Sequence, residues 1–306
     1  MKIDLQTTNS AKIATAMVKA RHAAGSPAMD MVLTLIVVTD EEGVSEALND
    51  ATAIAREHPA RIVGVIRESA RGAAALDAKI RIGNNMSGES ILLRVRGPLA
   101  QHAESVVLPL LLPDSPVVVW WPTHAPKNPA DDALRGLAQR RLTDCATAKV
   151  PRNALLSQAE NYAPGDTDLT WTRLTPWRAL LAAALDQVQS PVTRGAITAS
   201  RTSASAQLLI SWLEGRLGIE VDFTPSDTPY IQSVTLTTEL GDVSVIHRDQ
   251  NTANYVLPGL GSRIVPLEHR PVAGLLAEDL RRLDQDDVYA AALMHFQARH
   301  AKASAS

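Results

Sequence analysis

The chain has 306 residues, a formal net charge of −3 and one cysteine, Cys145. That length suffices for one large domain or two ordinary ones, and the small negative charge gives no indication of a nucleic acid or a membrane surface as a partner. A single cysteine excludes an intramolecular disulfide and a cysteine-rich zinc site. Because neither a signal peptide nor an apolar run of about 20 residues is visible, we expect a cytoplasmic protein without membrane contact.

The first part of the chain alternates helix and strand patterns. A first helix is predicted at 10–24, and apolar residues at helical spacing predict another at 44–55. The apolar runs at 29–39 and 62–66 on either side of the second helix are typical of parallel strands buried on both faces. A strand, a helix and a second strand with a short return require a parallel pair joined by a right-handed crossover.

Residues 79–82 and 91–96 predict a short antiparallel excursion at the edge of this sheet. The polar loop 83–88 between them could cradle an anion, although a plain turn is the simpler interpretation. Pro98 suits the first turn of a helix, and Pro109 is expected to end or kink that helix.

The strand around which we expect the sheet to be organised runs from Val117 to Trp121. Its three consecutive valines lack polar alternation, which predicts a strand covered on both faces. Pro116 and Pro122 flank it, where a missing N–H does least harm. Ligands of open α/β sheets bind beyond the carboxyl ends of the strands, so Trp120 and Trp121 lie where function is expected.

The middle of the chain predicts a boundary. Asp131 is expected to cap a short helix to Gln139, and residues 140–144 could form a further strand. Residues 153–168 are the best linker candidate, because they mix polar residues with Pro164-Gly165-Asp166.

Helix and strand signals resume beyond this linker. A helix is predicted from Trp171 through Leu185, and a strand at 196–200 precedes a helix that Thr202 or Ser203 caps. Gly218 is its expected C-terminal residue, beyond which 219–267 predict short strands and no helix. Residues 234–240 and 243–248 flank Gly241-Asp242, which predicts a two-residue type II′ hairpin loop. Two helices are predicted at the end, at 272–282 and 286–300.

Together these elements predict an α/β fold with a mostly parallel, Rossmann-like sheet flanked by helices. A C-terminal α+β part with antiparallel strands and two terminal helices follows. We place the N-terminal α/β domain at 1–165 and the C-terminal α+β domain at 166–306. The segment 170–218 could instead complete the first sheet.

Catalytic motifs are absent from the sequence. It contains no phosphate-binding Gly-x-x-x-x-Gly-Lys-Ser/Thr, no His-Glu-x-x-His and no Gly-x-Ser-x-Gly. The nearest approach to a dinucleotide fingerprint, Gly259-Leu-Gly261, has Ile264 where a third glycine belongs. We therefore expect no catalytic residues, no cofactor and no metal. The pair His247 and Asp249 is more typical of a polar strand face than of a catalytic dyad.

A possible anion site lies at Ser200, Arg201, Thr202 and Ser203, between a predicted strand and the start of a helix. Simple capping of the helix by Thr202 or Ser203 is the alternative. Cys145 is expected to be a small buried hydrophobe.

Tryptophan and arginine, the residue types that dominate interface hot spots, cluster in the middle of the chain. Arg140 and Arg141, together with Asp144, could form a charged patch near Trp120 and Trp121. The alternative is that the tryptophans fill the core and the arginines are solvated. Neighbouring strand residues point to opposite faces, so the two tryptophans cannot fill the same side.

Several long blocks make the chain similar to a known family. Residues 33–39, 57–63, 97–122, 140–144, 168–178 and 280–289 carry the resemblance, including the run from Gly97 to the Trp-Trp-Pro ending at Pro122. They resemble the OpcA family, the glucose-6-phosphate dehydrogenase assembly proteins of actinobacteria and cyanobacteria, and this sequence looks actinobacterial.

The resemblance implies a non-catalytic activator that binds glucose-6-phosphate dehydrogenase, promotes its active oligomer and supports NADPH supply in the oxidative pentose phosphate pathway. The single cysteine rules out an intramolecular disulfide switch. We place the partner-binding surface on the Trp- and Arg-rich blocks. Its expected residues are Trp120, Trp121, Arg140, Arg141, Trp171, Arg173, Trp177 and Arg178. The alternative is an enzyme or sensor of the same pathway that binds a sugar phosphate at Ser200–Ser203.

Overall fold

The computed structural model describes residues 1–24, 31–83 and 88–305, so the possible anion cradle at 84–87 lies outside the described residues. The chain divides into two compact units that interleave in sequence. Unit 1 comprises Met1–Asp144, Ala163–Thr167 and Val272–Gln285, and unit 2 comprises Cys145–Tyr162, Asp168–Pro271 and Asp286–Ser306. No helix within the described ranges combines the length and the apolar character that crossing a bilayer requires.

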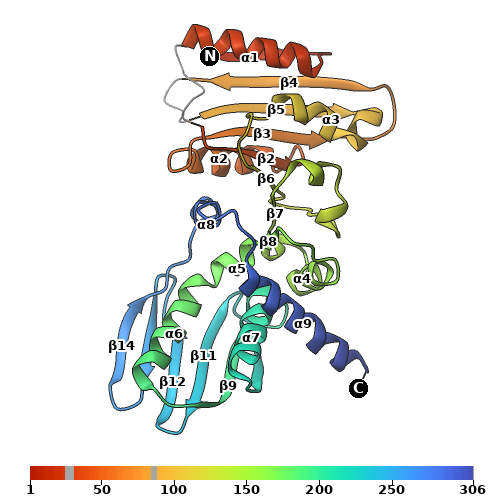
Figure 1. Ribbon diagram of the computed structural model, residues 1–306. Coiled ribbons are helices and arrows are strands. Elements are labelled where there is room, and N and C mark those ends of the chain that lie inside the picture. Colours follow the sequence, from red (N-terminus) through yellow and green to blue (C-terminus); the bar gives the residue numbers. More distant parts are fainter. Residues whose placement is uncertain (25–30, 84–87, 306) are drawn as a thin grey trace. The chain divides into compact units, whose positions relative to one another are not determined.

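Unit 1 is built on an eight-stranded sheet (Figure 1). Its elements are β1 (Lys2–Leu5), α1 (Ser10–Ala24), β2 (Leu33–Thr39), α2 (Val44–Ile54), β3 (Ala60–Arg67), β4 (Ala75–Ile82), β5 (Gly88–Arg96), the 3₁₀ helix η2 (Gly97–Gln101), α3 (Ala103–Val107), η3 (Leu108–Leu110), β6 (Val117–Trp120), η4 (Pro129–Asp131), η5 (Ala133–Leu137), β7 (Arg140–Thr143), β8 (Asp166–Asp168) and α8 (Val272–Asp279).

The strand order in this sheet is β1-β4-β5-β3-β2-β6-β7-β8. The pairs from β5 through β3, β2 and β6 to β7 are parallel, whereas β4 and β1 add antiparallel strands beside β5. The predicted mostly parallel sheet with an antiparallel edge is therefore confirmed. The chain leaves β2 toward β3 on one side and later returns as β6 on the other, which is the topological switch of doubly wound sheets.

Both faces of the central strands are buried, as their apolar runs predict. Every residue of β2 and of β6 is buried. Val117, Val119 and Trp121 share one core with residues of α1 and α3, such as Met17 and Val106. Helix α2 covers β2 and β3 and also packs on α8. Helices on both faces explain why no polar alternation is seen along these strands.

Unit 2 contains a six-stranded sheet of order β10-β9-β11-β12-β13-β14 (Figure 1). Its elements are the 3₁₀ helix η6 (Cys145–Thr147), α4 (Pro151–Glu160), α5 (Leu169–Arg173), α6 (Thr175–Val188), β9 (Val192–Ser200), α7 (Ala204–Leu217), β10 (Val221–Ser226), β11 (Ile231–Thr238), β12 (Gly241–His247), β13 (Thr252–Leu257), β14 (Gly261–Pro266) and α9 (Asp287–Ala305). The β9–β10 pair is parallel and the other pairs are antiparallel. The strand of the segment 170–218, β9, thus belongs to this second sheet.

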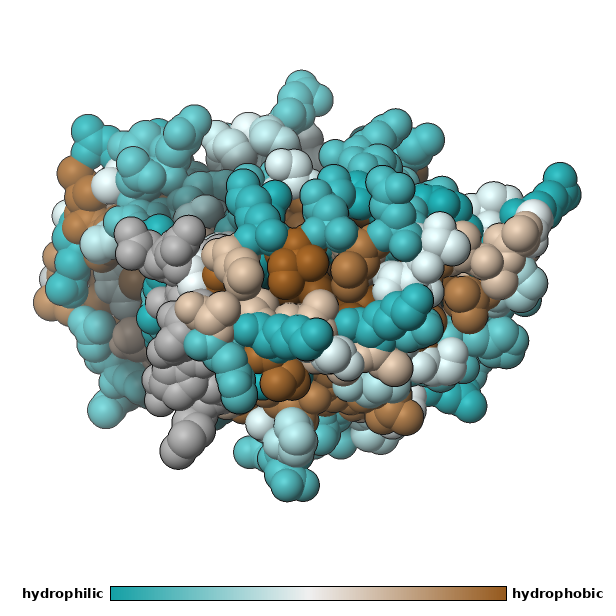
Figure 2. Space-filling view, turned by 90° about the horizontal axis from the view of Figure 1, so that it is seen from above, coloured by the Kyte–Doolittle hydropathy of each residue, from teal (hydrophilic) through white to brown (hydrophobic). Residues whose placement is uncertain are grey.

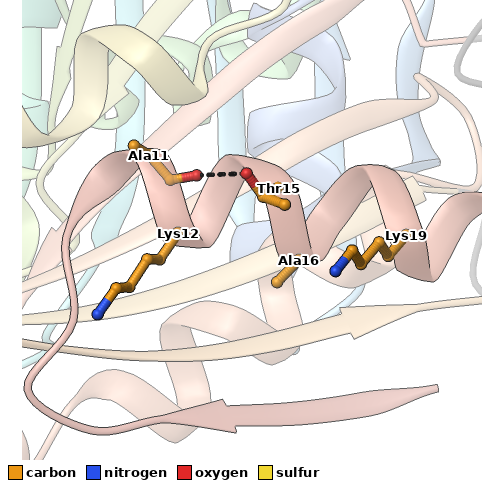
Figure 3. A pocket seen from close by; sticks show the side chains of 5 residues that line it. All are labelled: Ala11, Lys12, Thr15, Ala16 and Lys19. Carbon is orange, nitrogen blue, oxygen red and sulfur yellow. Dashed lines mark hydrogen bonds between the residues drawn. The ribbon is translucent and has the colours of Figure 1, made fainter.

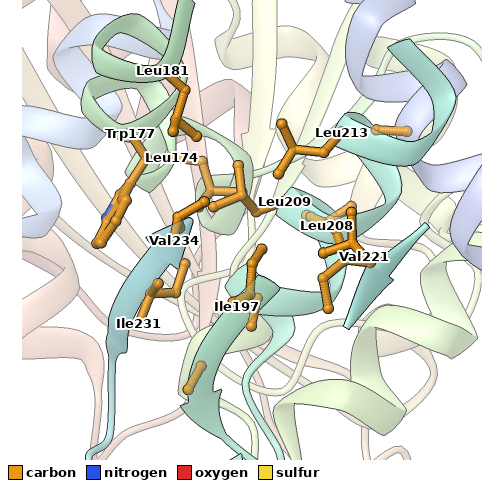
Figure 4. Close-up of a cluster of buried hydrophobic side chains, with 14 of the residues drawn as sticks. Leu174, Trp177, Leu181, Ile197, Leu208, Leu209, Leu213, Val221, Ile231 and Val234 are labelled. Atoms are coloured by element: carbon orange, nitrogen blue, oxygen red, sulfur yellow. The ribbon is translucent and has the colours of Figure 1, made fainter. Parts of the chain in front are cut away.

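One face of this second sheet carries the core of unit 2. Leu181 of α6 and Leu209 of α7 lie over Ile197 and Val234 of the central strands (Figure 4). Alternate residues of the same strands point the other way and are exposed or half-buried. We call this second side the open face. It consists of Arg194, Ala196, Thr198, Ser200, Asp222, Thr224, Ser226, Ser233, Thr235, Thr237, Asp242, Ser244, Ile246, Thr252, Asn254, Val256, Ser262, Ile264 and Pro266.

Two predicted helices in unit 1 are broken into short pieces. The helix that begins with Pro98 is divided into η2, α3 and η3, because His102 leaves the helical region and Pro109 cannot continue an α-helix. Asp131 was expected to cap a helix to Gln139, and that prediction is wrong. Asn128 and Asp132 cap the 3₁₀ helices η4 and η5 instead, by accepting bonds from Ala130 N and Leu134 N at 3.1 and 2.9 Å.

The segment expected as a linker, 153–168, contains regular structure, although the chain passes from one unit to the other within it, after Tyr162 and after Thr167. Pro151 starts α4, and Leu155 and Ala159, four residues apart, are buried on one helix face. The strand β8 follows. Asn153 and Glu160 of this helix are exposed, whereas Gln158 and Asp166 are buried despite their polar side chains.

Two further boundaries in unit 2 differ from the prediction. The helix expected from Trp171 is two helices, since Leu174 ends α5 and Pro176 lies in the first turn of α6. The hairpin between β11 and β12 exists, but Thr238 pairs with Gly241, so its loop is residues 239–240. Gly241, with φ of 120°, is the first residue of the returning strand. Ser203 caps α7 and Gly218 ends it with a φ of 65°, as predicted.

Candidate partner-binding surface

The two neighbouring tryptophans of unit 1 lie on opposite faces of the sheet and both are buried. Trp121 is 2% exposed and belongs to the core with α1 and α3. Trp120 is fully buried between Val37 of β2 and Leu142 of β7. Its Nε1 has no hydrogen-bond partner among the described residues. In this chain both tryptophans are therefore packing residues.

Arg140 and Arg141 are buried in separate ion pairs rather than in one solvated patch. Arg140 Nε lies 2.8 Å from Asp279 Oδ1, and Nη1 donates to the carbonyl of Asp284 at 2.6 Å. On the other face, Arg141 Nε lies 2.5 Å from Asp166 Oδ1. Burial raises the pKa of Asp166, against the lowering effects of the Ala163 amide and of Arg141. These arginines fasten β7 to segments far away in the sequence.

In unit 2, Trp171 and Arg178 form a stacked pair. The guanidinium carbon of Arg178 lies 3.6 Å from the centre of the Trp171 ring, which is cation–π geometry. Trp171 Nε1 donates to Asp286 Oδ2 at 2.8 Å, and the ring centre of Tyr289 lies 6.0 Å away. Trp171 is 2% exposed, whereas Arg178 and Arg173 are half-buried. The tryptophan thus supports an arginine that reaches the surface of the unit.

Trp177 is part of a cluster of four rings. Its ring centre lies 5.4 Å from that of His247, which in turn lies 5.1 Å from Tyr230. The Tyr230 and His269 ring centres are 6.2 Å apart. Burial, together with the neighbouring His269, lowers the pKa of His247, although the Asp249 carbonyl and carboxylate oppose the shift.

The predicted anion site is a conventional helix start. Ser203 Oγ accepts from Ala206 N at 3.1 Å, so the capping alternative holds for this residue. Ser200 Oγ and Thr202 Oγ1 lie 3.4 Å apart, and Arg201 is exposed. The four residues therefore lie together at the start of α7, with one of them engaged in the cap.

Acid–base and metal chemistry find little support in the geometry. His247 Nδ1 contacts the backbone oxygen of Asp249 at 3.0 Å, while the Asp249 carboxylate binds Thr252. The pair is therefore no catalytic dyad. Across the part of the chain that the structure describes, no group of three or more His, Cys, Asp or Glu is placed to hold a metal ion. Cys145 is buried, as expected.

A shallow pocket lies along the exposed side of α1 and was not predicted. It has a volume of about 310 Å³ and is lined by Ala11, Lys12, Thr15, Ala16 and Lys19 (Figure 3). In Figure 2, apolar side chains show between rows of hydrophilic ones. The lining residues come from a single helix, so they form a surface groove rather than an enclosed site.

Sequence reasoning missed the residues that hold the Trp and Arg side chains in place. Asp279, Asp166 and Asp286 lie 139, 25 and 115 residues away from their partners. An aspartate in a polar segment carries no local signal for such a pairing. The cluster around His247 was missed for the same reason.

Comparisons with known proteins identify the family. Residues 51–160 match the family described as the glucose-6-phosphate dehydrogenase subunit N-terminal domain, and residues 164–293 match the corresponding C-terminal domain. An OpcA protein of Synechocystis sp. is 29% identical over 144 residues, which is 42% of this chain and 29% of the relative. The match therefore covers less than a third of the length of that relative.

Solved structures are more distant. An oxidoreductase from Sinorhizobium meliloti is 12% identical with a TM-score of 0.41, and the match covers 89% of each chain. The WlbA dehydrogenase from Chromobacterium violaceum is 10% identical with a TM-score of 0.38, over 90% of this chain and 96% of that one. At these values the likeness supports no conclusion about function. The two consecutive domain matches and the OpcA relative, in contrast, show that the chain belongs to the OpcA family of glucose-6-phosphate dehydrogenase assembly proteins.

Proposed function

We propose that the protein is a non-catalytic assembly factor that binds glucose-6-phosphate dehydrogenase and promotes its active oligomer. The observation that carries the proposal is the pair of domain matches, both described as parts of a glucose-6-phosphate dehydrogenase subunit. In this role the protein supports the oxidative pentose phosphate pathway and NADPH supply in the cytoplasm of an actinobacterium.

The geometry favours partner contact through the arginines of the segment 171–178. Most of the residues predicted for the interface are buried within their own units. These are the four tryptophans Trp120, Trp121, Trp171 and Trp177, together with Arg140 and Arg141. Arg173 and Arg178 are half-buried and carry charge to the surface of unit 2. Stacking on the Trp171 ring restricts the motion of the Arg178 guanidinium before a partner binds. Less conformational entropy is then lost on binding, which favours this arginine as a contact residue.

The decisive experiment measures the rate and the particle mass of the dehydrogenase from the same organism in the same samples, with and without this protein. We expect a higher rate together with a larger mixed particle. If neither changes, the proposed function is wrong.

The contact surface is tested by Arg173→Ala and Arg178→Ala. Each variant should weaken complex formation at least fivefold while its circular dichroism stays that of the parent. Arg216→Ala, an exposed arginine in the last turn of α7, is the matched control and should bind like the parent. Equal binding by all three variants would remove this segment from the interface.

A sugar-phosphate enzyme or sensor is the second candidate, favoured by the exposed Arg201 beside Ser200 and Thr202 at the start of α7. Calorimetry with glucose 6-phosphate and the protein alone tests it. Saturable heat that Arg201→Ala abolishes would support this candidate, and no heat would exclude it for this ligand.

A further inference from the structure

The centre of the open face of the six-stranded sheet carries no charged side chain among the described residues. Register places Ala196, Thr235, Ser244, Val256 and Ser262 in one row across five neighbouring strands. All are small or β-branched, and all are exposed or half-buried. The described residues of this row include no charged side chain, so no charge along it would repel a covering surface.

A second row runs beside the first and is equally uncharged. It consists of Thr198, Ser233, Ile246, Asn254 and Ile264. Ile246 is 37% exposed and Ile264 57% exposed. Exposing two large aliphatic side chains on one flat face to water is unfavourable. A surface that covers them would remove this apolar area from water and so stabilise the contact.

Charge on the open face is confined to its margins. Arg194 and Asp222 neutralise each other through two hydrogen bonds of 2.7 and 3.1 Å, and Asp242 lies next to the hairpin loop. A face that packs against its own copy about a two-fold axis brings like residues together, so central charges would repel. A neutral centre avoids that penalty, and serine and threonine hydroxyls can each donate and accept.

The area suits a pair of copies. Six strands at about 4.8 Å spacing and about six residues in length cover roughly 550 Å² in plan. Two such faces together bury roughly 1,100 Å², which clears the lower bound of about 1,000 Å² expected of a biological interface and lies just below the size of a standard one. We infer that a second copy of this chain covers the open face, so that the protein is a face-to-face homodimer through β9–β14.

The experiment uses the full chain alone, so its outcome is independent of the proposed function. Sedimentation or light scattering should give twice the chain mass at micromolar concentration. Ala196→Lys/Ile246→Lys places two like charges per copy at exposed positions of the two rows and should reduce dimerisation at least tenfold. Ala196→Glu/Ile246→Glu should do the same.

A mixture of the Lys and Glu variants should restore the dimer, because opposite charges then face each other. This rescue also shows that both variants are folded. Ala182→Lys/Ala183→Lys, at exposed positions of α6, is the matched control and should remain dimeric. A monomeric parent, or dimeric Lys and Glu variants, would overturn the inference. A monomeric parent whose Lys variant no longer binds the dehydrogenase would instead assign the face to that enzyme.

Discussion

The two sheets of the molecule treat their surfaces differently. In unit 1 the central strands are covered on both faces, and even Arg140 and Arg141 are buried in ion pairs. In unit 2 helices cover one face, and the other presents a neutral band of small and aliphatic residues. The conspicuous Trp and Arg residues of unit 1 therefore stabilise its architecture, whereas unit 2 leaves one sheet face exposed.

The largest expected difference concerns buried and exposed ion pairs. Arg140 and Asp279 are 6% and 4% exposed, whereas Arg194 and Asp222 are 62% and 53% exposed. Arg140→Ala removes one partner of a buried pair and should lower the free energy of unfolding by about 3 kcal/mol. Arg194→Ala, the matched control, should cost much less, because water and salt screen its exposed pair. Urea unfolding measures both, and equal losses would contradict the comparison.

Matched valines test the coverage of the two sheets. Val119 is fully buried in unit 1, so Val119→Ala should cost about 2 kcal/mol through lost packing and a residual cavity. Val256 lies on the open face, and Val256→Ala should cost less than about 0.5 kcal/mol in the monomer. Thermal unfolding at low protein concentration separates the two. A large loss for Val256 would mean that this face is covered within the chain.

The tryptophans of the two units should also differ. Both Trp120→Phe and Trp171→Phe reduce ring volume, but Trp171 additionally loses its bond to the Asp286 carboxylate. A hydrogen bond to a charged group contributes about 1.5–3 kcal/mol, so Trp171→Phe should be the more destabilising by about 1 kcal/mol or more. Urea unfolding followed by circular dichroism gives the comparison. Equal losses of stability would show that the hydrogen bond from Trp171 to Asp286 does not stabilise unit 2 measurably.

The smallest expected effect is a pH dependence confined to unit 2. The lowered pKa of His247 means that the unfolded chain binds a proton at this residue more readily than the folded one. The contribution of His247 to the free energy of unfolding should therefore be fully present at pH values above 6.5, the ordinary pKa of histidine. It should decline as the pH falls below that value. Asp249 and His269 face the ring and are present in every variant compared.

His247→Phe should flatten this decline in melting temperature between pH 7 and 5. His22→Gln, at an exposed position on α1, is the control and should leave the slope unchanged. A slope that persists in His247→Phe would assign the pH dependence to another group.

Much of the fold is predictable from local pattern. The apolar runs of β2 and β6 correctly predict strands buried on both faces, and helical spacing in residues 44–55 predicts α2 within one residue. The errors fall where local composition is ambiguous. Helix α4 has a polar outer side and looks like a linker, and the loop between β11 and β12, residues 239–240, lies immediately before the glycine that suggested it.

The candidate site was only partly predictable. Trp171, Arg173, Trp177 and Arg178 do lie together in one unit, because they are close in sequence. Which of them reach the surface could not be read from residue type, since tryptophan and arginine occur in cores as well as in interfaces.

By itself the sequence determined most element types, the parallel character of the first sheet and the family, since hydrophobic periodicity, helix caps and long blocks of sequence are local properties. Tertiary structure alone decided the partners of Arg140 and Trp171, which lie 139 and 115 residues away. It also decided that the uncharged residues of β9–β14 form one continuous face. Such groupings depend on strand register and on which segments pack together, and no local stretch of sequence encodes either.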